Sequence, residues 1–382
     1  MELKKYKLGE ILDVTRGASL SGEFYATEGK YIRLTCGNFD YQNNCFKENK
    51  SKDNLYYIGD FKPEFLMEEG DIITPLTEQA IGLLGSTAII PESGKYIQSQ
   101  DVAKIICKEE LLDKDFVFYL ISSTLVKQQL SAAAQQTKIR HTSPDKIRDC
   151  TVWIPELTEQ KRIGKLLRSL DRKIELNRAI NQNLEAMAKQ LYDYWFVQFD
   201  FPNENGKPYK SSGGKMVWNE KLKREIPKGW NVLKLGEHCS FNKRTSNGYF
   251  NHPILYLDTS NITNNTIDEL QFLNPSSDII PSRARRLVQE GDIVYSTVRP
   301  NLKHFGIIMN PDYNMVVSTG FAVITANWSA YRYFIYQFLI QAATIENLST
   351  IAQSAVSAYP SINTSDIENL DLVVPPDSML EK

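Results

Sequence analysis

The chain has 382 residues, of which 42% are hydrophobic and 11% aromatic, enough to form the cores of two or three domains. Its formal net charge of −2 excludes a protein that is basic throughout, so a DNA-binding surface would need locally clustered charge. No apolar run long enough to predict a membrane span occurs, and the start, MELKKYKLGE, has no apolar signal core. Five scattered cysteines without a CxxC pair favour a reduced, cytoplasmic protein.

Residues 1–155 show a mixed pattern of strands followed by a helix. Short apolar runs such as GDIITPL, STAIIP and YIQSQDVAKIIC are bounded by Gly, Pro and Asn and predict strands. The later stretch DKDFVFYLISSTLVKQQLSAA has one helical pattern. Together they predict an α+β domain dominated by a curved or barrel-like sheet.

Residues 156–198 differ, because a helical pattern runs from about Thr158 to about Val197 without a proline and with a single glycine, Gly164. Apolar residues recur at heptad a and d positions, which predicts a coiled-coil seam for a partner helix, and the Asn at one a position is a device that sets register. The alternative is that this stripe packs on its own domain. About 40 residues at ~1.5 Å each span roughly 60 Å, which exceeds a small domain. The predicted helix-interface residues are Ile163, Leu166, Leu170, Asn177, Ile180, Leu184, Met187 and Leu191.

The following segment, 199–229, is rich in Gly, Pro, Asn, Ser and Lys, which predicts a linker or a long surface loop. Beyond it the first pattern returns. YKLGEILDVTRG (from Tyr6) matches LKLGEHCSFNKR (from Leu233), MEEGDIITPLTEQAIGLLGSTAII matches VQEGDIVYSTVRPNLKHFGII, and SPDKIRDCTVWIP matches NTSDIENLDLVVPP. The matches keep their order, which indicates two copies of one domain, 1–155 and 230–382.

The sequence contains no motif that predicts catalysis. GxGxxG and GxxxxGK[ST] phosphate loops are absent, and the four histidines lack zinc-ligand spacing. Asp145, Glu159 and Lys161 formally resemble the PD…ExK pattern of metal-dependent nucleases. However, Glu159 and Lys161 fall in the first turn of the predicted helix instead of on a strand beside Asp145. We therefore predict no catalytic, cofactor-binding or metal-binding residue.

Polar, turn-rich tracts between the strands are better candidates for nucleic-acid recognition. They fall at corresponding places in both copies but differ in sequence, as TPLTEQAIG and STVRPNLKHFG do, which is typical of two readers of different sequences. Arg can pair with guanine, Gln or Asn with adenine, and Lys with phosphate. An ordinary solvated loop is the alternative for each single residue. The predicted DNA-binding residues are Gln79, Gln136, Lys138 and Arg140 in the first copy and Lys243, Arg244, Arg299, Asn301 and Lys303 in the second.

With these features the sequence resembles the specificity subunits of type I restriction–modification systems. The resemblance is carried by the duplicated EGDI strand, by IPELTEQKRIGKLL, by LYDYWFVQFDFP leading into KREIPKGW, and by ILYLDTSNIT, and it covers nearly the whole chain. It implies an α+β chain in which two similar sheet-rich target-recognition domains are joined by a long coiled-coil-type helix. Each domain would read one half of an interrupted site on double-stranded DNA.

The resemblance also implies the partners. Modification (methyltransferase) subunits would carry S-adenosylmethionine and methylate adenine, and a separate restriction subunit would use ATP and Mg to translocate and cut DNA. This chain would hold no cofactor and would not contact a membrane. Two alternatives remain: a specificity chain that serves a fused nuclease–methylase cutting on both sides of its site, and a scaffold that uses the helix only for assembly.

The sequence departs from the family pattern at one place. A second conserved helix usually follows the second recognition domain, but here PPDSMLEK aligns with PELTEQK and the chain ends there. The seam on the long helix would then lack its usual partner in the same chain. We expect self-association through the seam, a helix supplied by another chain, or a subunit that assembles poorly.

Overall fold

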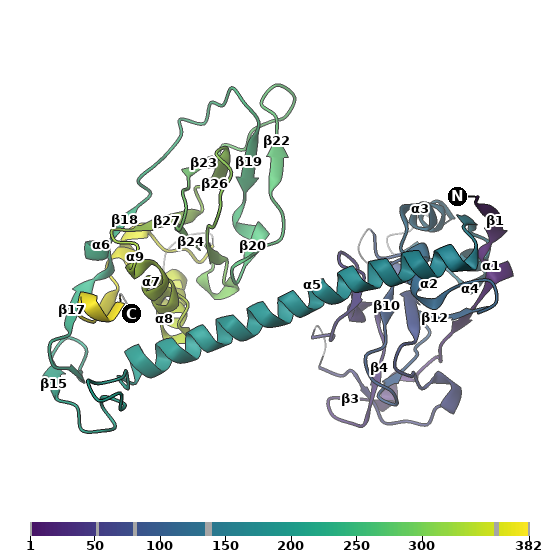
Figure 1. The fold of residues 1–382 in the computed structure, drawn as a ribbon, viewed down its shortest axis with the longest axis horizontal. Coiled ribbons are helices and arrows are strands. Elements are labelled where there is room, and N and C mark those ends of the chain that lie inside the picture. Colours follow the sequence, from purple (N-terminus) through teal and green to yellow (C-terminus); the bar gives the residue numbers. More distant parts are fainter. Residues whose placement is uncertain (1, 51–52, 79–81, 134–139, 355–358, 381–382) are drawn as a thin grey trace. The chain divides into compact units, whose positions relative to one another are not determined.

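The computed structural model describes residues 2–50, 53–78, 82–133, 140–354 and 359–380. It divides into two units, residues 1–179 (unit 1) and 180–382 (unit 2), and helix α5 (Leu157–Tyr192) runs from one into the other (Figure 1). Among these residues, no helix is both long and apolar enough to cross a membrane.

Unit 1 contains two four-stranded sheets within its described residues. The order of the first is β10-β8-β12-β2, with antiparallel neighbours, and the order of the second is β11-β4-β7-β3, in which β11 and β4 are parallel. The strands are β2 (Leu12–Arg16), β8 (Ile72–Pro75), β10 (Ala88–Ile89) and β12 (Val102–Cys107), and then β3 (Tyr25–Ala26), β4 (Tyr31–Arg33), β7 (Tyr56–Tyr57) and β11 (Tyr96–Ile97).

Short pairs and helices complete unit 1. The pairs are β1 (Lys4–Lys7) with β14 (Thr151–Ile154), β5 (Phe39–Asp40) with β6 (Cys45–Phe46), and β9 (Thr77–Glu78) with β13 (Arg140–His141). The helices are α1 (Leu8–Ile11), α2 (Lys114–Ile121), α3 (Thr124–Ala133) and α4 (Pro144–Arg148). All four residues of β8 are buried, so it is the central strand of the core.

Unit 2 repeats this arrangement. Its sheets have the orders β18-β27-β24-β25 and β22-β19-β26-β23, and β19 and β26 are again a parallel pair. The strands of the first are β18 (Cys239–Phe241), β24 (Ile293–Ser296), β25 (Phe305–Ile307) and β27 (Phe321–Ala326). Those of the second are β19 (Ile254–Leu257), β22 (Gln271–Leu273), β23 (Ala284–Leu287) and β26 (Met315–Ser318).

Two strand pairs of unit 2 also have counterparts in unit 1. β17 (Asn231–Lys234) pairs with β28 (Asp371–Val374) as β1 does with β14, and β20 (Ile262–Thr263) pairs with β21 (Thr266–Ile267). The helices are α6 (Leu235–His238), α7 (Tyr331–Leu339), α8 (Ala342–Ser354), α9 (Thr364–Glu368) and α10 (Asp377–Leu380). The predicted α+β architecture, with two similar sheet-rich regions joined by a long helix, is confirmed.

Two details of the prediction were wrong. The described strands of each unit form two four-stranded sheets and short two-stranded pairs, where one curved or barrel-like sheet was expected. The single helix expected in each copy is two helices, α2 and α3 in unit 1 and α7 and α8 in unit 2. In unit 1 the break falls at Ser122, whose hydroxyl donates to the carbonyl oxygens of Phe118 (3.2 Å) and Tyr119 (3.3 Å). Such side-chain bonds compete with the regular backbone pattern at a helix end.

Segment 199–229, expected to be a linker or a surface loop, is a packed part of unit 2. It contains the hairpin β15 (Met216–Asn219) and β16 (Arg224–Pro227), and Phe201 stacks on both Tyr209 (4.6 Å between ring centroids) and Trp230 (5.1 Å). Lys221 and Lys234 pair with Asp371 of β28 at 2.6 and 2.7 Å. Burial alone would raise the pKa of Asp371, but the two ammonium groups outweigh it and hold that pKa below its usual value.

Candidate nucleic-acid interface and helix seam

In unit 1, two polar loops are joined at the end of the central strand β8. β9, which follows β8, pairs antiparallel with β13, so that Arg140 lies opposite Glu78 and His141 opposite Thr77. The Thr142 N–H donates to the Leu76 carbonyl at 2.9 Å and extends this pairing. The residues that follow β8 and the residues around Arg140 therefore form one structure, called the loop pair below.

The Arg140 guanidinium is held beside a buried carboxylate. The Glu78 side chain is only 5% exposed, and its Oε1 accepts a hydrogen bond from the Gly82 N–H at 2.8 Å. Its Oε2 lies 3.6 Å from Arg140 Nη1 and, among the described residues, accepts no hydrogen bond. Arg140 Nη1 donates to Ser131 Oγ at 2.8 Å. The Arg140 side chain remains about one third exposed, so it is both fixed and accessible.

Unit 2 has a loop pair at the same place. The Ile362 N–H donates to the Thr297 carbonyl at 2.8 Å, Val298 bridges to Ser361, and the Arg299 N–H donates to the Pro360 carbonyl at 2.9 Å. The Arg299 guanidinium lies over the Tyr359 ring, with Cζ 5.5 Å from its centroid.

The first loop of this pair presents three predicted residues together. Arg299, Asn301 and Lys303 are all exposed around the short 3-10 turn Pro300–Leu302. Arg299 and Lys303 have φ angles of 49° and 59°, a left-handed conformation that costs a non-glycine residue roughly 1 kcal/mol or more. The buried Pro300 and the hydrogen bond from the Asn264 N–H to the Lys303 carbonyl (3.0 Å) hold the turn in this form.

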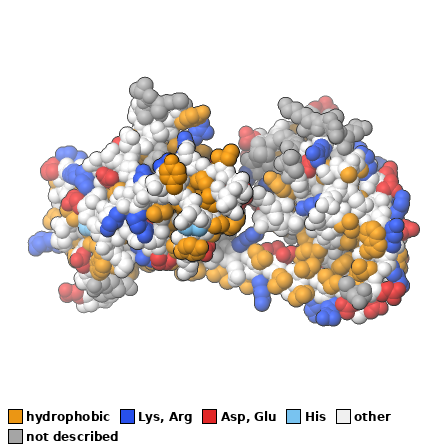
Figure 2. All heavy atoms as spheres, turned by 90° about the horizontal axis from the view of Figure 1, so that it is seen from above, with side chains coloured by type: hydrophobic (Ala, Val, Ile, Leu, Met, Phe, Trp, Pro, Cys, Tyr) orange, Lys and Arg blue, Asp and Glu red, His pale blue; other side chains and the backbone are white. Residues whose placement is uncertain are grey.

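The remaining predicted residues fall into two groups. Lys243 is exposed, whereas Arg244 Nη2 pairs at 3.0 Å with Oδ2 of Asp292, whose side chain is 1% exposed. Gln79, Gln136 and Lys138 lie outside the described residues. In Figure 2, blue Lys and Arg side chains are interspersed with red Asp and Glu, as the net charge of −2 leads one to expect. Where the chain is described, no cluster of three His, Cys, Asp or Glu could hold a metal ion.

The seam predicted on helix α5 is exposed over most of its length. Ile163 is half-buried and Asn177 is exposed, while the fractional exposure of the other predicted interface residues runs from 45% at Ile180 to 64% at Met187. Those others are Leu166, Leu170, Ile180, Leu184, Met187 and Leu191. A continuous apolar stripe of this kind on a soluble surface usually marks an interface.

The first turns of α5 are fastened to unit 1. The buried Gln160 side chain accepts a hydrogen bond from the Asp113 N–H and donates to the carbonyls of Leu111 and Pro155, at 3.0, 3.1 and 2.9 Å. Tyr119 Oη donates to Asp171 Oδ2 at 2.5 Å, and burial together with this bond raises the pKa of Tyr119.

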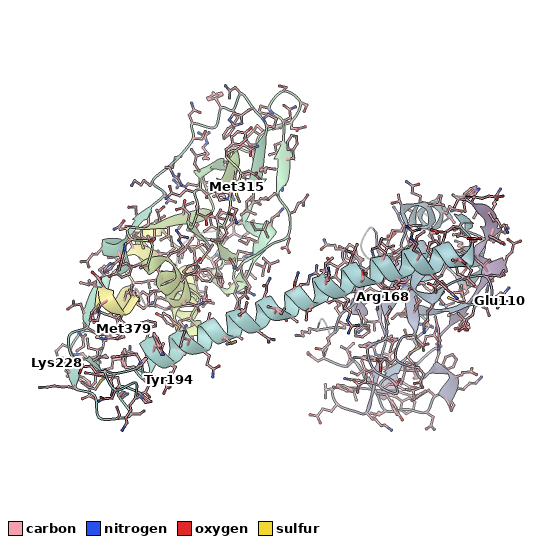
Figure 3. The ribbon with its side chains drawn as sticks, viewed as in Figure 1. Glu110, Arg168, Tyr194, Lys228, Met315 and Met379 are labelled. Carbon is pink, nitrogen blue, oxygen red and sulfur yellow. The ribbon has the colours of Figure 1, made fainter. Side chains whose placement is uncertain are left out.

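The far end of α5 is fastened to unit 2 by aromatic side chains. A π-helical turn, Asp193–Val197, follows the helix. Tyr192 and Phe196 pack on Phe334 of α7 with centroid separations of 5.6 and 4.9 Å. Figure 3 labels Arg168 in the first half of α5 and Tyr194 just beyond its end. The seam therefore lies on a helix whose two ends are anchored by residues that do not belong to the seam.

Sequence reasoning missed Glu78, Tyr359 and Gln160. Glu78 lies within TPLTEQAIG, but its burial is not visible in the sequence. The available signal was the repeat itself, which sets TPLTE (74–78) against YSTVR (295–299). The polar contacts of Gln160 have no sequence signature.

Comparison with known proteins identifies the family. The family model for the type I restriction modification DNA specificity domain matches residues 1–186 and 227–379. The MjaIX specificity subunit of Methanocaldococcus jannaschii, a type I restriction enzyme subunit, is 24% identical over 294 residues, which are 74% of this chain and 63% of that protein. The HindI specificity subunit of Haemophilus influenzae, another type I restriction enzyme subunit, is 29% identical over 149 residues, 38% of this chain and 32% of that protein.

The alignments thus span less than two thirds of the length of these curated relatives. The crystal structure of a type I restriction–modification system S subunit from M. genitalium superposes with a TM-score of 0.57 at 15% identity, and the match covers 100% of this chain and 87% of that one. This likeness concerns the fold. Because the family model matches residues 1–186 and 227–379, most of the sequence, the chain belongs to the family of the type I restriction modification DNA specificity domain.

Proposed function

We propose that this chain is the DNA sequence-specificity subunit of a type I restriction–modification complex. Residues 1–155 and 230–382 act as two target-recognition domains, each reading one half of an interrupted site on double-stranded DNA. Residues 156–198 form the spacer helix, and 199–229 connect it to the second domain. The observation that carries the proposal is the loop pair, which recurs at the end of β8 and of β24 with different side chains.

The chemistry belongs to partners in this proposal. The chain itself is non-catalytic and cofactor-free, while modification subunits bind S-adenosylmethionine and methylate adenine, and a restriction subunit uses ATP and Mg. Support comes from the relatives, which are named as specificity subunits, and from the candidate residues, whose side chains suit recognition of bases and phosphates.

The seam on α5 is the assembly surface in this proposal. Its exposed Leu, Ile and Met side chains suit a coiled-coil contact with helices of the modification subunits or with a second copy of this chain. The polar Asn177 at a heptad a position would select one register of that contact.

The test is to co-express the chain with its modification subunit and to map adenine methylation across the host genome. An asymmetric two-part motif is expected if both domains of one chain read DNA. A palindromic two-part motif would mean that two chains associate and that each contributes one domain.

The same experiment can overturn the proposal. If both proteins are soluble and form a complex but no adenine is methylated above the background of the empty vector, the chain does not direct methylation. Retention of the complex without any DNA binding would instead favour the scaffold role.

A further inference from the structure

Backbone pairing defines which residues of the two units are equivalent. Thr74 of β8 pairs with Ala103, and Tyr295 of β24 pairs with Ala322, so these two strands are in the same register. Two residues further along, the carbonyls of Leu76 and Thr297 accept hydrogen bonds from the N–H groups of Thr142 and Ile362. The next pairs outward are Thr77 with His141 in unit 1 and Val298 with Ser361 in unit 2.

One step beyond these pairs, Glu78 faces Arg140 in unit 1, and Arg299 faces Pro360 in unit 2. Glu78 and Arg299 therefore occupy the same position of the fold, and so do Arg140 and Pro360. The step, called the terminal rung below, carries one arginine in each unit. The arginine comes from the second loop in unit 1 and from the first loop in unit 2.

We propose that the terminal rung is a base-reading position of each recognition domain, where Arg140 in one domain and Arg299 in the other contacts a guanine in the major groove. This inference rests on the proposed function and adds the residues and the base. Arginine suits the task because two parallel N–H donors of its planar guanidinium match N7 and O6 of guanine.

Glu78 acts as a positioning residue for Arg140. A carboxylate that is 5% exposed cannot reach a base edge, but it lies 3.6 Å from the guanidinium and fixes its place. Since Oε2 accepts no hydrogen bond among the described residues, the charge on Arg140 is the main compensation for its burial. The contacts of the Arg140 guanidinium to Glu78 and to Ser131 both involve Nη1, so the N–H donors on Nε and Nη2 suffice for a guanine.

Arg299 is positioned by different means. Its left-handed backbone (φ 49°) and the bond from its N–H to the Pro360 carbonyl fix the direction in which the side chain leaves the turn. The Tyr359 ring supports the guanidinium through a cation–π contact, which consumes no hydrogen-bond donor. Arg299 is exposed, so its guanidinium is accessible to DNA.

The test compares methylation motifs of the full chain, co-expressed with its modification subunit, as wild type and as Arg299→Gln, Arg140→Gln, Glu78→Gln and the double variant Glu78→Gln/Arg140→Gln. Lys228→Gln, at an exposed lysine of unit 2 (Figure 3), is the control for loss of one positive charge. Arg299→Gln should relax the preference for G at one base pair of one half-site, by roughly 5- to 150-fold, and leave the other half-site unchanged.

Arg140→Gln should relax one base pair of the other half-site. Glu78→Gln should relax the same base pair as Arg140→Gln, and the double variant should match Arg140→Gln alone, because the two residues act as a unit. Arg140→Gln leaves the buried Glu78 carboxylate without its cation and can lower stability. The double variant removes both charges and keeps the test valid if the single variant folds poorly.

Two outcomes would overturn the inference while the proposed function stands. An unchanged motif in Arg299→Gln and in the double variant would show that the terminal rung does not read bases. An equal loss at all sites, without any change of motif, would show contacts to phosphate only. If the wild-type complex itself produces no methylated motif, the proposed function fails and the inference fails with it.

Discussion

A buried carboxylate lies next to the candidate nucleic-acid interface in each unit, Glu78 in unit 1 and Asp292 in unit 2. Each is stabilised by the hydrogen-bond donors around it. Asp292 at the start of β24 accepts hydrogen bonds from Thr325 Oγ1 (2.6 Å), from the Gln289 N–H (2.9 Å) and from Arg244 Nη2 (3.0 Å). Because burying a charge without a partner is costly, Arg244, which hydrogen-bonds Asp292 directly, contributes to stability, whereas Arg140 lies farther from its carboxylate, at 3.6 Å. This separates Arg244 from its neighbour Lys243, which is exposed.

Substitution of these adjacent residues should therefore have different effects. Arg244→Ala should lower the free energy of unfolding by about 1–3 kcal/mol, because it leaves the Asp292 carboxylate buried with one donor fewer. Lys243→Ala should change stability by less than about 0.5 kcal/mol. Urea denaturation followed by tryptophan fluorescence measures both. Equal stabilities of the two variants would show that the ion pair contributes nothing.

Replacement of Gly164 by alanine should lower the free energy of unfolding, although a change from glycine to alanine normally stabilises a helix. A Cβ at this position would lie 2.7 Å from the Phe116 nitrogen and 2.9 Å from Asp113 Oδ1, where Asp113 caps α2. Gly164→Ala should gain about 1 kcal/mol of helix propensity but lose more through this clash with backbone, for a net loss of about 1–3 kcal/mol. Thermal unfolding gives the sign. Asn181→Ala, at an exposed position of the same helix, is the control and should be neutral or slightly stabilising.

Different residues of helix α5 anchor the helix and form its exposed seam. Gln160 and Tyr119 fasten its first turns to unit 1, while Tyr192 and Phe196 fasten its end to unit 2. Between them the seam residues remain exposed, so removing their apolar surface costs little folding free energy. An assembly defect can thus be told apart from a folding defect.

Leu184→Glu tests the seam directly. Leu184 is 56% exposed at a heptad a position, so the variant should unfold within a few degrees of the wild type. A carboxylate buried at a coiled-coil interface is costly, and the variant should lose at least tenfold in affinity for its partner, whether a modification subunit or a second copy. Gln182→Glu, at an exposed position off the seam, adds the same charge and should bind normally. Co-purification and sedimentation velocity provide the measurements, and normal assembly of Leu184→Glu would exclude the seam as the interface.

At the scale of the whole molecule, the sequence predicted the duplicated domain, from its repeated segments, and the long helix, from its apolar period. The duplication was visible because EGDI and the segments before β14 and β28 recur in order, and α5 was visible because thirty-six residues keep one apolar stripe. The split between α2 and α3 was not visible, since Ser122 breaks the helix through its own hydroxyl bonds. The packing of segment 199–229 was missed because its aromatic residues are scattered among turn-forming ones.

The candidate interface was predictable only in part. The sequence marked Arg140 and Arg299 as candidates, but the pairing of the loops that carry them depends on backbone bonds between residues far apart in the chain. These bonds join Leu76 to Thr142 and Thr297 to Ile362. The equivalence of Glu78 and Arg299 follows from this pairing. The pairing also shows that the arginine is on the second loop in unit 1 (Arg140) and on the first loop in unit 2 (Arg299). Side-chain identity alone could not separate Lys243 from Arg244.

The net charge of −2 bears on how the affinity of the whole chain for DNA depends on salt. Since the overall field does not attract a polyanion, binding must come from a few local cations such as Lys303, and each phosphate contact releases counterions. The affinity of the complex for a duplex carrying its methylated site should fall steeply between about 50 and 200 mM salt. Lys303→Gln should reduce the slope of log K against log salt by about 0.9 if Lys303 contacts a phosphate, and Lys228→Gln should leave it unchanged. Fluorescence anisotropy titrations give both slopes, and an affinity that does not depend on salt would contradict a binding mode based on phosphate contacts.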